Sequence, residues 1–354
     1  MSHHKSRNIL SSELLSSTSR HKRYNLRHSS RPKATSYDKP RNTRFLEKDF
    51  RTNVPKPRYA YVTLVMCGDE YSQGALALAW SLRQQDTKHE LVVMATPDVS
   101  VRALRLLKKL YDRVLSISYI ETKVNCRLRG KRYREENKWM NHIMTKARML
   151  KLTEYSKIIW LDADMLVTEN IDSLFDVPAP AGICSSIRNH DHWHSTKLPE
   201  LEVENSLRNN YGIYGCILIL EPNLDDYLLS SSQPIVGDKA SFVGPDDYFF
   251  TKLYQRKWYH LHVKYGCTRW HEDRLGIEPA VIHFVGAKPW GERDWVLCGE
   301  GSGEDEWAGL VQWREVVQDM VRECPVMKSA YAENITRKMR RSKSAMPLLR
   351  MITA

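Results

Sequence analysis

The sequence predicts an α/β protein with a single, mostly parallel, Rossmann-like sheet flanked by helices. Two observations support this prediction. Between residues 59 and 117, short apolar runs rich in β-branched and aromatic residues alternate with Ala- and Leu-rich or amphipathic runs. The connections between these runs are short, which favours strand–helix–strand units with parallel strands. Ligands of such sheets bind beyond the carboxyl ends of the strands, so we sought candidate site residues directly after each strand.

The first half of the pattern supplies three strands and two helices in alternation. Gly68 and Asp69 end the first strand and Pro97 ends the second, because these residue types interrupt regular structure. The Ala- and Leu-rich run between them has strong helix propensity. The predicted strands cover 59–66, 90–95 and 114–117, and the predicted helices cover 74–82 and 101–111.

The second half begins after a basic loop at residues 122–137. Its clearest element is the buried strand Ile158–Leu161, which Asp162-Ala163-Asp164 follows at once. The other predicted elements are a helix over 139–152, a turn and helix over 167–175, strands over 215–220 and 280–284, and helices over 246–254 and 304–321.

The charge of the chain is unevenly distributed. The formal net charge is +12, yet residues 1–58 hold 15 Lys and Arg against four acids, which leaves the remainder nearly neutral. We therefore predict a disordered basic leader (1–58), a globular domain (59–325) and a basic C-terminal tail (326–354). This distribution does not favour nucleic-acid binding by the whole protein, because only the leader has that character.

The sequence also indicates the cellular compartment in which we expect the protein. No apolar run approaches the roughly 18 residues of a membrane span, and the N-terminus lacks the apolar stretch of a secretory signal. The seven cysteines are scattered singly, which argues against a disulfide framework and against a thiolate zinc site. We expect a cytoplasmic protein, with nuclear or organelle targeting by the leader as the alternative.

The two carboxylates after the most apolar strand form a candidate metal site. Residues i and i+2 of an extended chain point to the same side, so Asp162 and Asp164 converge. Two close carboxylates repel each other unless a cation lies between them, and oxygen ligands suit Mg²⁺ or Mn²⁺. A D-x-D triplet is common by chance, and such an Asp is often only a helix cap. Its position at the end of this strand is what favours a metal site.

Two further residues extend this candidate site. His283 ends a short buried strand, and Lys288 follows in a Gly-containing segment. An imidazole shifts the expected metal from Mg²⁺ toward Mn²⁺, and a lysine can neutralise a phosphate. A lone strand histidine is more often a hydrogen-bonded core residue, so the following lysine is what makes a metal-bound diphosphate plausible. From spacing alone, Lys146 is typical of a solvated helix lysine.

The segment Trp160–Phe175 resembles the D-x-D region of the glycogenin-like family-8 retaining glycosyltransferases. After the strand and D-x-D come Val167 and the run Asn170-Ile171-Asp172-Ser173-Leu174-Phe175. The match extends to Tyr61–Leu64 with Tyr71–Leu76, to Thr145-Lys146, and to His283–Trp290, so that five segments in the family's order span about residues 59 to 291. The first segment is also similar to glycogenin-related proteins of large insect DNA viruses.

The resemblance implies a glycosyltransferase-A type fold and a hexosyltransferase activity. The expected donor is a UDP-sugar, with glucose as the transferred sugar, and the expected cofactor is Mn²⁺, with Mg²⁺ as the alternative. The acceptor would be a hydroxyl group of a glycan or a protein, and the anomeric configuration would be retained. By analogy with glycogenin-like relatives we also expect a homodimer.

The resemblance also implies roles for single residues. The metal ligands would be Asp162, Asp164 and His283. The donor-binding residues would be Leu64, Tyr71, Lys146, Asp162, Gly286 and Lys288. The catalytic residues, near the transferred sugar, would be Asp246 and Asp247.

The sequence departs from the family pattern near the sugar. Asp247 replaces the usual Gln, and Ile213-Tyr214-Gly215 replaces an Asn-containing segment. An alternative function therefore stays open, a catalytically inactive glycosyltransferase-like binding protein whose basic leader binds nucleic acid. The enzyme is favoured because the D-x-D carboxylates, His283 and Lys288 are all present.

Overall fold

The structure is a computed structural model that describes residues 57–122, 138–186, 194–209, 211–232, 244–286, 288–290 and 307–331. These residues belong to one compact unit. The predicted leader, except for its last two residues, and most of the predicted tail lie outside the described residues. In the described part of the chain, no helix is both long and apolar enough to cross a membrane.

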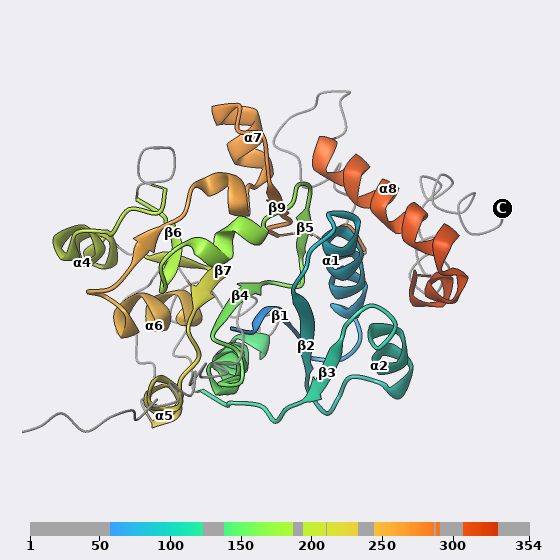
Figure 1. The fold of residues 1–354 in the computed structure, drawn as a ribbon, viewed down its shortest axis with the longest axis horizontal. Coiled ribbons are helices and arrows are strands. Elements are labelled where there is room, and N and C mark those ends of the chain that lie inside the picture. The colour runs from blue at the N-terminus through green and yellow to red at the C-terminus, as the bar shows by residue number, and fades with distance from the viewer. Residues whose placement is uncertain are drawn as a thin grey trace, which may run out of the picture. The chain divides into compact units, whose positions relative to one another are not determined.

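The main sheet has seven strands in the order β3-β2-β1-β4-β7-β6-β8 (Figure 1). They are β1 (Tyr59–Val65), β2 (Glu90–Ala95), β3 (Arg113–Ser116), β4 (Lys157–Leu161), β6 (Ala181–Cys184), β7 (Ile213–Leu220) and β8 (Tyr259–His260). All neighbours are parallel except β7, which is antiparallel to β4 and to β6. The predicted fold class, an α/β protein with a mostly parallel sheet, is confirmed. The structure adds a second sheet, in which β5 (Met165–Val167) pairs antiparallel with β9 (Val281–His283).

Helices cover both faces of the main sheet. The α-helices are α1 (Ser72–Gln84), α2 (Val101–Leu107), α4 (Glu200–Arg208), α5 (Leu224–Ser232), α6 (Pro245–Leu253), α7 (Arg269–Leu275) and α8 (Ala308–Glu323). The 3₁₀-helices are η1 (Lys138–Asn141), η2 (Ile143–Lys151), η3 (Asp172–Asp176), η5 (Val263–Gly266) and η7 (Pro325–Met327). Helices α1 and α8 lie side by side (Figure 1).

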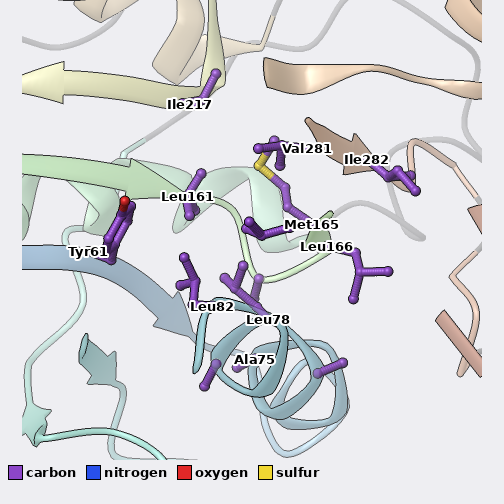
Figure 2. Packing of buried hydrophobic residues seen from close by; sticks show 14 of the residues in the cluster. Tyr61, Ala75, Leu78, Leu82, Leu161, Met165, Leu166, Ile217, Val281 and Ile282 are labelled. Atoms are coloured by element: carbon purple, nitrogen blue, oxygen red, sulfur yellow. The ribbon is translucent and has the colours of Figure 1, made fainter. Parts of the chain in front are cut away.

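The two-residue period of the strands divides the core into two buried clusters. On β1, Tyr61 and Val65 point into a cluster with α1, α2, α8 and the β5–β9 sheet, whereas Val62 and Leu64 point into one with η2, α4 and α6. Figure 2 shows the first cluster, in which Leu78 and Leu82 of α1 lie near residues of β4, β5 and β9. Burial on both faces explains why these strands are continuous apolar runs in the sequence.

The segment 139–152, predicted as one helix, forms the 3₁₀-helices η1 and η2 instead. Most of η2 is buried, including the adjacent Thr145 and Lys146, so it lacks the single apolar stripe of an amphipathic α-helix. The Thr145 hydroxyl also accepts a hydrogen bond from the Ile120 N–H at 2.9 Å. Packing on several sides, rather than helix propensity, sets the geometry of this segment.

The packed body continues past the predicted domain boundary at residue 325. Met327 and Tyr331 are both buried in the α1–α8 cluster. The Tyr331 hydroxyl donates a hydrogen bond to the Gln73 carbonyl at 2.8 Å. Residues up to 331 are therefore part of the globular domain and not of the tail.

Candidate active site

Asp162 and Asp164 lie in the turn that joins β4 to β5, at the carboxyl end of β4. The Asp162 N–H donates to the Cys216 carbonyl at 2.9 Å, which extends the β4–β7 ladder by one residue. The Asp164 carbonyl accepts from the Phe284 N–H at 3.0 Å, and Met165 pairs directly with His283. The small second sheet thus brings His283 beside the D-x-D turn, although more than 100 residues separate them in the sequence.

These three side chains form a cluster that fits a divalent cation. Asp162, Asp164 and His283 each offer one ligand atom, and these atoms lie within 4.8 Å of one another. Asp164 Oδ1 is buried and lies 3.5 Å from His283 Nε2, and it accepts no hydrogen bond from the described residues, which fits an atom that serves as a metal ligand. Two carboxylates and one imidazole suit Mn²⁺ or Mg²⁺.

Lys288 and Tyr71 flank the cluster. The Lys288 ammonium pairs with Asp164 Oδ2 and donates to the Phe284 carbonyl at 2.6 Å. It also lies 5.9 Å from the centroid of the Tyr71 ring, whose edge meets Trp290. Lys288 therefore adds positive charge next to the carboxylates, as a site for a diphosphate requires.

Lys146 joins the D-x-D turn to the N-terminal end of α6. Its Nζ lies 3.0 Å from Asp162 Oδ1, 2.5 Å from Asp246 Oδ2 and 3.0 Å from the Gly215 carbonyl. The contacts with Asp246 and Gly215 are hydrogen bonds, and the contact with Asp162 is an ion pair. Although burial opposes its charged form, the charges of Asp162 and Asp246 raise the pKa of Lys146 above its usual range. Lys146 is therefore a buried, fixed cation and not the solvated helix lysine that its spacing indicates.

Asp247 binds two backbone amides instead of a side chain. Its Oδ1 accepts from the Gly215 N–H at 2.5 Å, and its Oδ2 accepts from the Gly244 N–H at 2.9 Å. Gly215 is required here, because a Cβ atom would lie 2.6 Å from Asp247 Oδ1 and 2.8 Å from Asp246 Oδ2. Burial, and next the charge of Asp246, raise the pKa of Asp247 to about 7.

The pKa values of the ion cluster follow from its charges. Burial raises the pKa of Asp162, against the opposing effect of Lys146. At Asp164 burial acts in the same direction, but Lys288 and His283 outweigh it and hold the pKa below its usual range. Burial would lower the pKa of His283, but Cys216 and Asp164 raise it to about 10. Because a metal-bound imidazole must be neutral, metal affinity at this cluster is expected to rise with pH.

Comparison with known proteins identifies the family. The family model described as "Glycosyl transferase family 8" matches residues 62–294, well over half of the chain. The chain belongs to glycosyl transferase family 8. This result confirms the resemblance predicted from the five sequence segments, and all the residues discussed above as site candidates lie within the matched range.

Family-8 relatives are found in viruses and in animals. An uncharacterised protein of Acanthamoeba polyphaga mimivirus is 32% identical over 245 residues, which cover 66% of this chain and 82% of that protein. Human glycogenin-1 is 38% identical over 117 residues, so the match spans about a third of each chain. A crystal structure of the galactosyltransferase LgtC with donor and acceptor sugar analogues covers 73% of this chain and 94% of its own, at 16% identity and a TM-score of 0.46. The similarity to insect viruses stays a prediction.

Most of the family-8 residues predicted from the sequence meet in one place, and the side chain of Leu64 does not. Lys146, Asp162, Asp164, His283, Lys288, Asp246, Asp247 and Tyr71 form the connected group described above. Leu64 is 7% exposed and packs in the η2–α6 core cluster, so its side chain has little surface for a nucleoside. Gly286 has a left-handed backbone (φ +86°), and no atom of the described residues would lie within 4 Å of a Cβ added there, which fits a backbone contact with a ligand.

Sequence reasoning missed several residues that shape this family-8 site. The Trp160 indole N–H donates to Asp162 Oδ1 at 2.8 Å, and Gly74 of α1 lies against Ala163. The signal for Trp160 was present, since residues 160 and 162 share one face of a strand. No sequence signal marks Gly74, because its role depends on how α1 packs against the D-x-D turn.

Proposed function

We propose that this family-8 glycosyltransferase is metal-dependent and retaining, and that it transfers a hexose, glucose, from a UDP-sugar to a hydroxyl acceptor. We propose Mn²⁺ as the cofactor, with Mg²⁺ as the alternative. The observation that carries this proposal is the cluster of Asp162, Asp164 and His283, whose ligand atoms lie within 4.8 Å of one another and beside Lys288. This is the set of charges that a metal-bound diphosphate needs.

Each charged residue then has a chemical role. Asp162, Asp164 and His283 would hold the cation, which when bound supplies Lewis-acid stabilisation of the negative charge on the departing UDP. Lys288 would bind the diphosphate, and Tyr71 and Gly286 would contact the donor beside it. Lys146 holds its positive charge between Asp162 and Asp246, so it stabilises charge without having to move during the reaction.

The two acidic residues of α6 are suited to different tasks. Asp246 faces the ion side of the site, since its Oδ2 pairs with Lys146, which also contacts Asp162. Asp247 has one backbone amide on each oxygen. We therefore propose Asp246 as the carboxylate that stabilises or attacks the oxocarbenium-like centre at the anomeric carbon, and Asp247 as the residue that fixes the start of α6.

The test is UDP release from a series of UDP-sugars with Mn²⁺, with Mg²⁺ and with a chelator. We expect turnover with UDP-glucose that the chelator abolishes, and NMR of the product should show a retained anomeric configuration. Asp164→Asn removes one of the three ligand side chains and should abolish Mn²⁺-dependent donor binding. A matched control is Asp112→Asn, which removes a carboxylate paired with Arg83 outside the site.

The outcome decides between enzyme and binding protein. Absence of UDP release with every UDP-sugar, together with absence of Mn²⁺-dependent UDP binding, would contradict the proposal and favour the inactive binding protein. Unchanged donor affinity in Asp164→Asn would refute the site assignment alone. The homodimer, the cytoplasmic location and nucleic-acid binding by the leader stay predictions from the sequence.

A further inference from the structure

We propose that Trp160 is a positioning residue of the ion site, which fixes the orientation of the Asp162 carboxylate through a hydrogen bond to its Oδ1. This inference rests on the metal dependence proposed above and adds a residue to which the sequence analysis gives no role. Trp160 is 1% exposed, and its indole N–H donates to Asp162 Oδ1 at 2.8 Å. A buried indole N–H needs an acceptor, and here the acceptor is an oxygen of a metal-ligand carboxylate.

The backbone of β4 produces this contact. Residues i and i+2 of a strand point to the same face, so Trp160 and Asp162 both face η2, the helix that carries Lys146. Trp160 pairs with Leu218 of β7 and belongs to the η2–α6 core cluster, which fixes the position of its ring. Because the Trp160 ring is fixed by packing, its hydrogen bond also restrains the Asp162 carboxylate, which follows the strand.

The Lys146 ammonium group contacts the same oxygen, Asp162 Oδ1. Its Nζ lies 3.0 Å from Asp162 Oδ1 and 5.4 Å from the centroid of the Trp160 ring. The Trp160 hydrogen bond and the ion pair with Lys146 thus act on the same oxygen of Asp162 and together restrain the orientation of this carboxylate.

Removing the indole N–H of Trp160 should leave the Asp162 carboxylate in place but make its orientation less restrained. In Trp160→Phe, Asp162 keeps its ion pair with Lys146 but loses the hydrogen bond to its Oδ1. Loss of a residue that orients a metal ligand typically weakens metal affinity by about 10- to 100-fold. We expect a loss at the lower end of that range, because Lys146 remains.

The experiment measures binding of Mn²⁺ alone to the full chain, by EPR of the free ion. The matched control is Trp80→Phe, which removes an indole N–H donated at 3.1 Å to Asp319 Oδ2, a carboxylate on α8 and outside the ion site. We expect about tenfold weaker Mn²⁺ binding in Trp160→Phe and wild-type affinity in Trp80→Phe. Thermal unfolding of both variants shows whether each is folded.

Three results would overturn the proposal. These are wild-type Mn²⁺ affinity in folded Trp160→Phe, an equal loss in Trp80→Phe, or no Mn²⁺ binding by the wild-type chain. The third would contradict the proposed metal dependence itself, whereas the first two contradict only the role of Trp160. If Trp160→Phe does not fold, β-(3-benzothienyl)alanine incorporated at position 160 keeps the ring shape and removes the N–H. We expect the same tenfold loss in that protein, and unchanged affinity would overturn the proposal.

Discussion

Asp246 and Asp247 are adjacent carboxylates with different partners, so their substitutions should have different effects. Asp246→Asn removes a charge from Lys146 and a carboxylate from the sugar side, and we expect kcat for UDP-sugar turnover to fall by about 10²-fold or more. Asp247→Asn keeps one acceptor for the two backbone amides, and we expect a smaller loss of kcat. Steady-state kinetics of both variants test this difference. A larger loss of kcat in Asp247→Asn would mean that Asp247 is the residue at the anomeric carbon.

Asp172, the acid of the Asn-Ile-Asp run, acts on stability and not on the site. Its carboxylate accepts hydrogen bonds from the Tyr61 hydroxyl at 2.7 Å, the Thr87 hydroxyl at 2.6 Å and the Lys88 N–H at 2.9 Å. Burial opposes ionisation, but these hydrogen bonds outweigh it and lower the pKa of Asp172. A lowered folded-state pKa means that this stabilisation is present above the unfolded pKa, near 3.9, and is lost as the pH falls through the folded value.

We therefore predict that Asp172→Asn lowers the free energy of unfolding by about 2 kcal/mol at pH 7. The amide cannot accept on both of its atoms, so at least one of the three donors loses its partner. Urea unfolding at pH 7 and at pH 3 tests this, and the difference from wild type should shrink at pH 3. Asp176→Asn, at an exposed position of the same 3₁₀-helix η3, is the control and should change stability by less than about 0.5 kcal/mol. Equal effects of the two substitutions would contradict the prediction.

At the scale of elements, the sequence predicts best those strands and helices whose residue pattern is contained in one short segment. Strands β1, β2 and β4 lie within one residue of their predicted bounds, because burial on both faces makes each a continuous apolar run. The short strands β6 and β8 and helices α4, α5 and α7 were missed, since short or mostly exposed elements show no clear period. The β5–β9 pairing could not be predicted either, because it joins segments far apart in the sequence.

The candidate site shows the same division between local and long-range information. The spacing of Asp162 and Asp164 after a strand is local, and the structure places both beside His283 as the sequence predicts. The burial of Lys146 is not local, because it depends on acceptors from β7 and α6. The burial of Trp290 is not local either, because its ring is 3% exposed and packs against Gly74 of α1.

Helix α1 supports the D-x-D turn through Gly74. A Cβ atom at this position would overlap the Ala163 carbonyl oxygen and the Trp290 ring. Replacing a mid-helix Gly by Ala usually stabilises a helix by roughly 0.5–1 kcal/mol. Here we predict the opposite sign, a loss of about 1–3 kcal/mol from overpacking, and weaker Mn²⁺ binding because the turn that carries Asp162 and Asp164 must shift.

Thermal unfolding and Mn²⁺ EPR of Gly74→Ala test this prediction. The control is Gly309→Ala in α8, where the nearest atoms of the described residues to a Cβ would be side-chain atoms of Trp307 and Ile282, at 2.8 and 3.3 Å. Side chains can shift more readily than backbone, so the control should lose less stability and keep its Mn²⁺ affinity. Unchanged stability and affinity in Gly74→Ala would show that α1 does not position the turn.

At the scale of the whole molecule, the net charge says little about the reaction. Most of the +12 lies before residue 59, outside the range that the family-8 model matches. The charges that matter for the proposed chemistry lie at strand and helix ends inside the globular domain, and burial and mutual contact set their protonation. The extent of the globular domain therefore says more about the proposed chemistry than the net charge of the chain does.

The last prediction concerns where the domain ends. The sequence places the boundary at 325, whereas Met327 and Tyr331 pack in the α1–α8 cluster. A chain of residues 57–331 should unfold at nearly the same temperature as the full protein and keep its UDP-sugar turnover. A chain of residues 57–325 loses two buried side chains, worth about 1.5–3 kcal/mol each, and the hydrogen bond from Tyr331 to α1, so it should unfold several degrees lower.

Tyr331→Phe in the longer chain removes only that hydrogen bond and should lower the free energy of unfolding by about 1 kcal/mol. Equal melting temperatures of the two truncated chains would restore the boundary at 325.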